Sequence, residues 1–219
     1  MTNSGIPVSE VLPIAQKLKK VLSLGELSCV EQIKYCSSSH DSLNYPISAT
    51  VELTYSCHHA CRHCMNSSSP KYARGLEKTS SYWIALIREM RSRGLFHIYF
   101  SGGETIRFEG YKQVFDACDE LGVRYLLVSD LAGHSEVDFI NLSTCKNLDM
   151  VRVSLDGHDA VTHDYLRGRG AFDATIRGIK TLQDLGINVG IYHSVHRKKR
   201  LIPLAPVPQN VVTGGWGWL

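Results

Sequence analysis

Three cysteines lie close together in one short segment of the chain. They are Cys57, Cys61 and Cys64, separated by three and then by two residues. Thiolates are soft ligands that select zinc or iron–sulfur clusters. A closed structural zinc site needs four protein ligands, whereas a cubane cluster held by three cysteines leaves one iron free for a substrate or cofactor. The spacing therefore predicts a metal centre with three thiolate ligands.

Histidines next to these cysteines leave a second interpretation open. His58, His59 or His63 could supply a fourth ligand, and the chain would then be a zinc-holding binding module. The remaining cysteines lack such spacing and are most simply small buried or incidental residues; they are Cys29, Cys36, Cys118 and Cys145.

The composition indicates a folded domain in a reducing compartment. Of 219 residues, 43% are hydrophobic and 21% are charged, which excludes a disordered chain. The net charge of +3 is too mild to favour nucleic acid as the main partner. No run approaches the roughly 18 apolar residues of a membrane span, and the N-terminus lacks the order of a signal peptide. We expect a cytoplasmic protein whose clustered thiols bind metal rather than form disulfides.

From residue 47 onward, strand-like runs alternate with helical runs. The predicted strands are residues 47–55, 95–100, 123–128, 150–154 and 187–192, and helical periodicity separates them. Parallel strands need such helical crossovers. The pattern predicts an α/β fold, a partial TIM-like (β/α)6 barrel of parallel strands with about five βα units. The cysteine segment follows the first strand, and sites of such barrels gather at the C-terminal ends of the strands.

The chain divides into three regions by pattern. Residues 1–46 form an N-terminal helical extension, with a helix between Ser9 and Leu22, and residues 47–196 form the barrel core. Residues 197–219 form a divergent tail without clear structure. From 201 to 219 this tail holds three of the seven prolines, two of the three tryptophans and no charged residue.

The cysteine segment, set in a parallel βα chain, resembles the radical S-adenosylmethionine (radical SAM) superfamily, whose hallmark is the same spacing. The resemblance implies a 4Fe–4S cluster held by Cys57, Cys61 and Cys64. Gly102, Gly103 and Glu104 are similar to the family's Gly-Gly-Glu motif, which binds the amino group of SAM. Paired glycines let the backbone approach a ligand, and a carboxylate accepts hydrogen bonds from an ammonium group. Thr105 replaces the proline that usually follows.

A later segment resembles the peptide-modifying and cofactor-maturation branch of this superfamily. It comprises residues 153–157 and 163–168. The resemblance implies that Ser154 contacts the ribose or amino acid part of SAM and that Arg167 pairs with its carboxylate, a contact that suits a forked guanidinium. Without the family, residues 154–157 are a strand end and a turn, and Arg167 is a surface residue.

Two further positions take a role from the resemblance. His63 stands where the family usually has an aromatic side chain near the adenine of SAM, and an imidazole can stack there. Ser129, followed by Asp130, ends the third strand where the family often places polar contacts to SAM. No general acid or base is assigned.

The resemblance implies a reaction and its partners. The reduced cluster passes one electron to SAM, and the resulting 5′-deoxyadenosyl radical takes a hydrogen atom from a substrate, for which a peptide or protein fits this branch. The electron comes from an external donor of the flavodoxin or ferredoxin type. Neither nucleic acid nor a membrane is expected as a partner.

The resemblance covers about residues 47–196 and then stops, and the sequence diverges from near Lys198 and Lys199. Family members of this type continue with a sixth βα unit, and many carry a cysteine-rich C-terminal domain. We therefore expect a truncated or frameshifted product. A non-catalytic remnant, which keeps the cluster and SAM residues in an incomplete barrel, is the remaining alternative.

Overall fold

Parallel strands form the framework of the molecule. The computed structural model describes residues 45–73, 75 and 77–194, and the backbone of 211–216. Each strand pairs in parallel with the next one along the chain, so that the strand order follows the sequence without reversal. The strands are β1 (Ser48–Glu52), β2 (His97–Ser101), β3 (Arg124–Ser129), β4 (Leu148–Ser154), β5 (Val189–Ser194) and β6 (Val211–Trp216).

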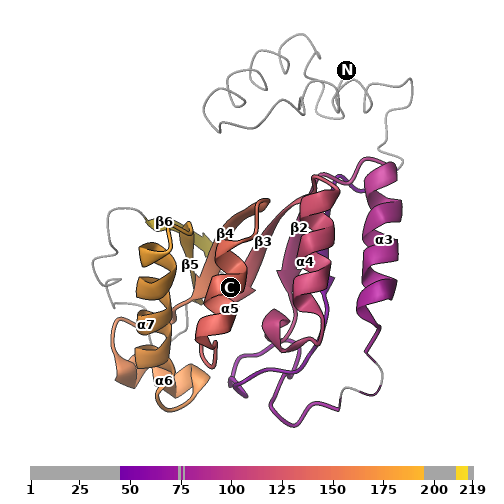
Figure 1. The fold of residues 1–219 in the computed structure, drawn as a ribbon. Helices are drawn as coiled ribbons and strands as arrows, with labels where there is room; N and C mark the ends of the chain where they lie inside the picture. Colours follow the sequence, from indigo (N-terminus) through magenta and orange to yellow (C-terminus); the bar gives the residue numbers. More distant parts are fainter. Residues whose placement is uncertain (1–44, 74, 76, 195–210, 217–219) are drawn as a thin grey trace, which may run out of the picture.

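The described helices lie on one face of this sheet (Figure 1). Right-handed crossovers between strands that add in one direction all fall on the same side, which is the winding of a barrel rather than of a doubly wound sheet. The predicted α/β fold of partial TIM-like barrel type is therefore confirmed. The helices are α3 (Ser80–Ser92), α4 (Tyr111–Glu120), α5 (Glu136–Ser143), α6 (Ala160–Arg167), α7 (Ala171–Asp184) and the 3-10 turn η2 (Thr105–Arg107).

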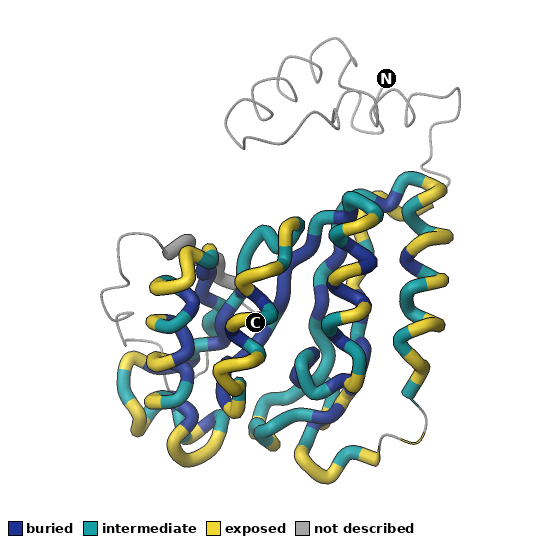
Figure 2. The backbone as a smooth tube through the Cα atoms, in the orientation of Figure 1, coloured by how far each residue is buried: buried dark blue, intermediate teal, exposed yellow. Residues whose placement is uncertain are grey.

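The hydrophobic core fills the space between the helices and the sheet. Alternate strand residues point to this side, and Figure 2 shows them as the dark-blue segments behind the helices. Phe100 on β2, Phe115 on α4 and Tyr125 on β3 are fully buried, with ring centres 5.0 to 5.5 Å apart. Because this face is closed, the strand residues between them project to the opposite, concave side of the sheet.

Local signals in the sequence locate most of these elements correctly. Thr79 is a favourable N-cap residue, and its hydroxyl accepts a hydrogen bond from the backbone N–H of Tyr82 at the start of α3. The five predicted strands correspond to β1 to β5, with ends that differ by a few residues. Helix α6 was not predicted; it begins soon after the strand end and turn at residues 154–157. The predicted helix within residues 9–22 lies outside the described residues.

The expectation that residues 197–219 lack clear structure is wrong for part of that tail. Residues 211–216 form β6, which pairs with β5 over its whole length. The β-branched run Val211, Val212 and Thr213 favours a strand. Gly214 and Gly215, with the prolines before them, hide the alternating pattern on which the prediction depended. Among the described residues, no helix has the length and hydropathy required to cross a membrane.

Candidate functional site

All ten residues singled out from the sequence line one pocket at the C-terminal ends of the strands. The site therefore lies where the barrel prediction placed it. The lining includes three further residues, Ser101, Val128 and Asp130. The predicted ten are Cys57, Cys61, His63, Cys64, Gly102, Gly103, Glu104, Ser129, Ser154 and Arg167.

Backbone hydrogen bonds hold the cysteine segment between β1 and α6. The N–H of Cys57 donates to the carbonyl of Ser69 at 3.2 Å, and the N–H of Arg62 donates to the carbonyl of Leu166 at 2.9 Å. The Sγ of Cys64 also accepts a hydrogen bond from the N–H of Ser68 at 3.3 Å. The segment is thus held by the loop that follows it and by α6.

The three cysteines of the segment lie together at the pocket. All three cysteines are free. Within the described part of the chain, no three His, Cys, Asp or Glu side chains form a single-ion site. Burial raises the pKa of Cys57 to about 12 and that of Cys61 to about 11, so a bound cation must replace the thiol protons.

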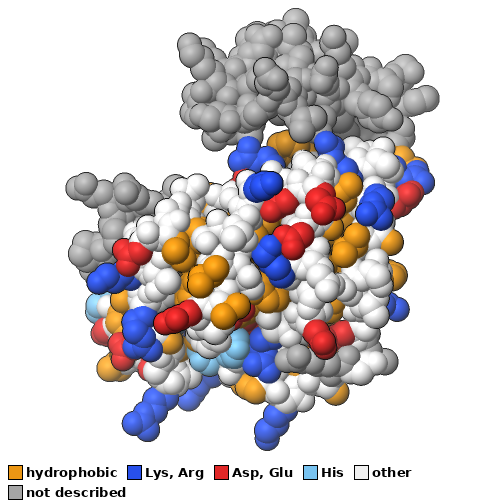
Figure 3. Space-filling view, in the orientation of Figure 1, with side chains coloured by type: hydrophobic (Ala, Val, Ile, Leu, Met, Phe, Trp, Pro, Cys, Tyr) orange, Lys and Arg blue, Asp and Glu red, His pale blue; other side chains and the backbone are white. Residues whose placement is uncertain are grey.

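The histidines next to the three cysteines contact groups other than the thiols. The Nδ1 of His59 lies 3.1 Å from a carboxylate oxygen of Asp130, and the Nε2 of His63 lies 3.3 Å from one of Asp156. The ring of His58 packs against Gly133. Figure 3 shows histidine surface gathered at the end of the molecule where the strands finish. Among the described residues, no histidine completes the four-ligand zinc site of the alternative interpretation.

The two glycines allow the turn after β2 to lie against the segment that carries the cysteines. The N–H of Gly103 donates to the carbonyl of Thr54, and that of Glu104 donates to the carbonyl of Ser56, both at 2.8 Å. A Cβ on Gly103 would lie 2.3 Å from the carbonyl oxygen of Ser56. Gly102 has a φ of +108°, which favours glycine. Contact between protein segments therefore requires glycine here, independently of any ligand.

Glu104 places an unpaired carboxylate oxygen at the pocket. Its side chain is 2% exposed, and its Oε2 accepts hydrogen bonds from the hydroxyl of Ser129 at 3.0 Å and the N–H of Asp130 at 3.3 Å. Its Oε1 has no hydrogen-bond partner among the described residues. Burial and the nearby Asp130 carboxylate raise the pKa of Glu104 well above its usual range. A cationic donor bound in the pocket would satisfy this oxygen and stabilise the charged form.

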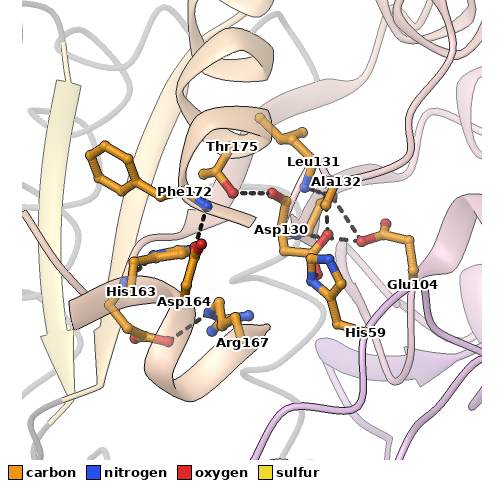
Figure 4. A network of polar contacts seen from close by, with 12 residues as sticks. His59, Glu104, Asp130, Leu131, Ala132, His163, Asp164, Arg167, Phe172 and Thr175 are labelled. Atoms are coloured by element: carbon orange, nitrogen blue, oxygen red, sulfur yellow. Dashed lines mark hydrogen bonds and ion pairs between the residues drawn. The ribbon is translucent and has the colours of Figure 1, made fainter. Parts of the chain in front are cut away.

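Asp130 connects the end of β3 to the helical side of the site (Figure 4). Its backbone carbonyl accepts a hydrogen bond from the hydroxyl of Thr175 on α7 at 2.7 Å, and its Oδ1 accepts one from the N–H of Ala132 at 2.9 Å. Burial alone would raise the pKa of Asp130, but the contact with His59 outweighs it and lowers that pKa. Leu131 follows with a φ of +60°, a strained conformation for a leucine at a sharp turn.

Arg167 is a buried member of the site, so its interpretation as a surface residue is wrong. It lies in the last turn of α6 with 11% of its side chain exposed, and its Nε donates to the Oδ2 of Asp156 at 2.6 Å. Asp156 is fully buried, and its Oδ1 accepts the N–H of Ser194 at 2.8 Å. Burial would raise the pKa of Asp156, yet His63 and Arg167 together lower it.

The sequence analysis missed several supporting side chains. Asp156 was given no role, although an acidic residue just after the fourth strand is a signal for this end of a barrel. The amide of Asn66 donates to a carboxylate oxygen of Glu52 at 3.0 Å and to the carbonyl of Gly102 at 3.3 Å. The Nε of Arg107 donates to the hydroxyl of Ser56 at 2.9 Å. These distant pairs carry no local sequence signal.

Comparison with known proteins also leads to the radical SAM superfamily. The model of the radical SAM superfamily matches residues 51–198. The sporulation killing factor maturation protein SkfB of Bacillus subtilis (strain 168) is 32% identical over 161 residues, which cover 73% of this chain and 38% of SkfB. The antilisterial bacteriocin subtilosin biosynthesis protein AlbA of the same strain is 30% identical over 183 residues, covering 82% of this chain and 40% of AlbA. The chain thus spans about two fifths of the length of these relatives.

A solved structure has the same fold. SuiB of Streptococcus suis, bound to S-adenosylmethionine, superposes with a TM-score of 0.65 at 19% identity, covering 86% of this chain and 45% of SuiB. The family as a whole uses a 4Fe–4S cluster and SAM. From its pocket and from the match over residues 51–198, the chain belongs to the radical SAM superfamily.

Proposed function

We propose that this chain holds the cluster-binding and SAM-binding core, residues 47–196, of a radical SAM maturase that modifies a peptide or protein. The observation that carries the proposal is the single pocket in which three free thiols lie together with the unpaired oxygen of Glu104. Relatives named as maturation proteins support the substrate class. A cytoplasmic location and an external flavodoxin-type or ferredoxin-type donor belong to the same proposal, because free thiols and low-potential electrons require a reducing compartment.

Each part of the pocket has a separate task in this proposal. Cys57, Cys61 and Cys64 would hold the 4Fe–4S cluster, and the bound cluster would supply the electron for cleavage of SAM to methionine and a 5′-deoxyadenosyl radical. The Oε1 of Glu104 accepts hydrogen bonds from the ammonium group of SAM. Gly102 and Gly103 let the turn after β2 lie against the segment that precedes the cysteines, which brings the backbone of this turn to the methionine part of SAM.

The remaining lining residues surround the other groups of SAM. Arg167 supplies positive charge for the carboxylate of SAM, while Asp156 holds the guanidinium in position through its Nε. His63 provides a ring for the adenine, and Ser129 and Ser154 provide hydroxyls at the strand ends. None of these side chains is proposed as an acid or a base, because the chain's task is to bind SAM and exclude water.

Iron binding tests this function. After anaerobic reconstitution with iron and sulfide, we expect about four irons per chain. The single variants Cys57→Ala, Cys61→Ala and Cys64→Ala should each lose most of the iron and the visible absorbance. Cys145→Ala is the matched control and should keep both. One zinc per chain in a colourless protein would contradict the proposal, and so would full iron content in the three variants.

A further inference from the structure

One arginine on the described strands has no carboxylate partner within the part of the chain that the structure describes. The described strands carry two arginines, and the first, Arg124, is paired with Asp149, its Nε donating to Oδ1 at 2.6 Å. The second, Arg152 in β4, lies within 4 Å of no carboxylate among the described residues. A partly buried cation without a counter-charge is unfavourable, and a bound anion would relieve it.

Arg152 projects from the face of the sheet that the helices leave uncovered. Its neighbours Val151 and Val153 are fully buried in the core on the helical side, so the side chain between them points the opposite way. The same alternation places Tyr99 and Tyr192 on the concave face, because Phe100 and Ile191 lie in the core. These three side chains therefore share the face of the sheet opposite the helices, whose position on one side of the strands is shown in Figure 1.

The two tyrosines hold the guanidinium without neutralising it. The Nη1 of Arg152 donates a hydrogen bond to the hydroxyl of Tyr192. Its Cζ lies 5.0 Å from the ring centre of Tyr192 and 5.9 Å from that of Tyr99, which are distances of cation–π contacts. Its register partner on β5 is Gly190, which adds no side chain beside it. The group is fixed in position and keeps further N–H donors for a ligand.

This group lies directly beneath the proposed SAM pocket. Ser154 is two residues farther along β4 on the same face, and Ser101 is two residues beyond Tyr99 on β2; both line the pocket. Two residues advance a strand by about 7 Å. The atoms next to a carboxylate bound at Arg152 would therefore lie only one layer of side chains away from the pocket.

We propose that Arg152, positioned by Tyr99 and Tyr192, binds a carboxylate of the peptide substrate and thereby presents the adjoining residue to the SAM pocket. The inference rests on the proposed function and specifies its substrate. A planar guanidinium binds carboxylates through two parallel hydrogen bonds. The hydroxyl of Tyr192, which accepts from Arg152, keeps its own proton to donate to the same ligand. The carboxylate belongs either to an acidic side chain or to the C-terminus of the peptide.

Three short peptides distinguish a carboxylate on an acidic side chain from one at the C-terminus of the peptide. The first is acetyl-Gly-Gly-Glu-Gly-Gly-amide, the second is acetyl-pentaglycine with a free C-terminal carboxylate, and the third is acetyl-Gly-Gly-Gln-Gly-Gly-amide, which has neither. Their dissociation constants are measured by ligand-observed NMR on the reconstituted chain with SAM present. We expect one of the first two to bind at least tenfold more tightly than the third. Equal binding of all three peptides would overturn the proposal.

Single variants test whether Arg152 causes the preference for a peptide that carries a carboxylate. Arg152→Gln should abolish the preference for a carboxylate, and Arg152→Lys should keep part of it, because an ammonium group lacks the fork. Tyr192→Phe keeps the ring and should lower the preference about threefold. This variant tests the site even if Arg152→Gln fails to fold. Arg88→Gln, a change at an exposed arginine of α3, is the control and should bind as the parent does. A preference that persists in Arg152→Gln places the carboxylate elsewhere and contradicts the proposal.

SAM cleavage without peptide, measured on the same samples, separates this inference from the function on which it rests. Formation of 5′-deoxyadenosine in a parent chain that lacks the carboxylate preference would overturn the role of Arg152 alone. A carboxylate preference in a chain that forms no 5′-deoxyadenosine would overturn the proposed function instead.

Discussion

Asp156, which is fully buried, accepts a hydrogen bond from the Nε of Arg167 at 2.6 Å. The pair joins the end of β4 to the end of α6, and the backbone N–H of Ser194 adds β5 to the same carboxylate. A buried charge that loses its partner cannot be rehydrated. One carboxylate thus fixes three elements around the pocket.

We predict that Asp156→Asn lowers the free energy of unfolding by about 3 kcal/mol, because Arg167 is left buried without its counter-charge. Urea denaturation of the apo chain under anaerobic conditions measures this change. Asp184→Asn, at an exposed carboxylate, is the control and should stay within about 0.5 kcal/mol of the parent. The double variant Asp156→Asn with Arg167→Met should show a coupling energy of at least about 1 kcal/mol. Simple additivity of the two changes would show that the pair does not act as a unit.

Glycine at position 103 should be required for the fold as well as for the ligand. Because an added Cβ meets the carbonyl oxygen of Ser56 at 2.3 Å, Gly103→Ala should lower the free energy of unfolding of the apo chain by about 2 kcal/mol. Gly75→Ala meets no atom within 4 Å and is the matched control. An apo stability equal to that of the parent would mean that the two segments separate at no cost, and the assigned role of this glycine would then be wrong.

Glu104→Gln should separate ligand binding from stability. The change removes a buried carboxylate whose pKa is raised, so the free energy of unfolding should stay the same or rise. The affinity for SAM, measured by equilibrium dialysis on the reconstituted chain, should fall at least tenfold, since hydrogen bonds between charged groups are among the stronger ones. Glu136→Gln at an exposed carboxylate of α5 should leave both quantities unchanged. An unchanged affinity in Glu104→Gln would remove the ammonium site from this account.

The ion pairs of Asp149 should contribute to stability only above acid pH. Burial would raise the pKa of Asp149, but hydrogen bonds from His97 and Arg124 outweigh it and lower that pKa below its usual value. A lowered native pKa means that the contribution is complete above the unfolded value, about 3.9, and is lost as the pH falls through the native value. The stability difference between the parent and Asp149→Asn, about 1 kcal/mol, should therefore not decrease from pH 7 to 5 and should shrink below about pH 4. A difference that already shrinks between pH 7 and 5 would contradict this assignment.

The sequence predicts the elements of this fold better than the contacts between them. Periodicity places β1 to β5 and most helices, because this signal is local. The cysteine spacing and the Gly-Gly-Glu motif locate the pocket, since parallel strands bring their C-terminal ends together. The partners of Asp156 come from residues 63, 167 and 194, and pairs so far apart leave no periodic trace. Strand β6 was missed because glycines and prolines mask its pattern.

Reductive cleavage of SAM tests the central claim most directly. The reconstituted chain, reduced with dithionite under anaerobic conditions, is incubated with SAM, and 5′-deoxyadenosine is quantified by liquid chromatography and mass spectrometry. The account predicts this nucleoside and methionine in equal amounts from the parent and from Cys145→Ala, and neither product from Cys61→Ala. A parent chain that binds about four irons and SAM but forms no 5′-deoxyadenosine would contradict it.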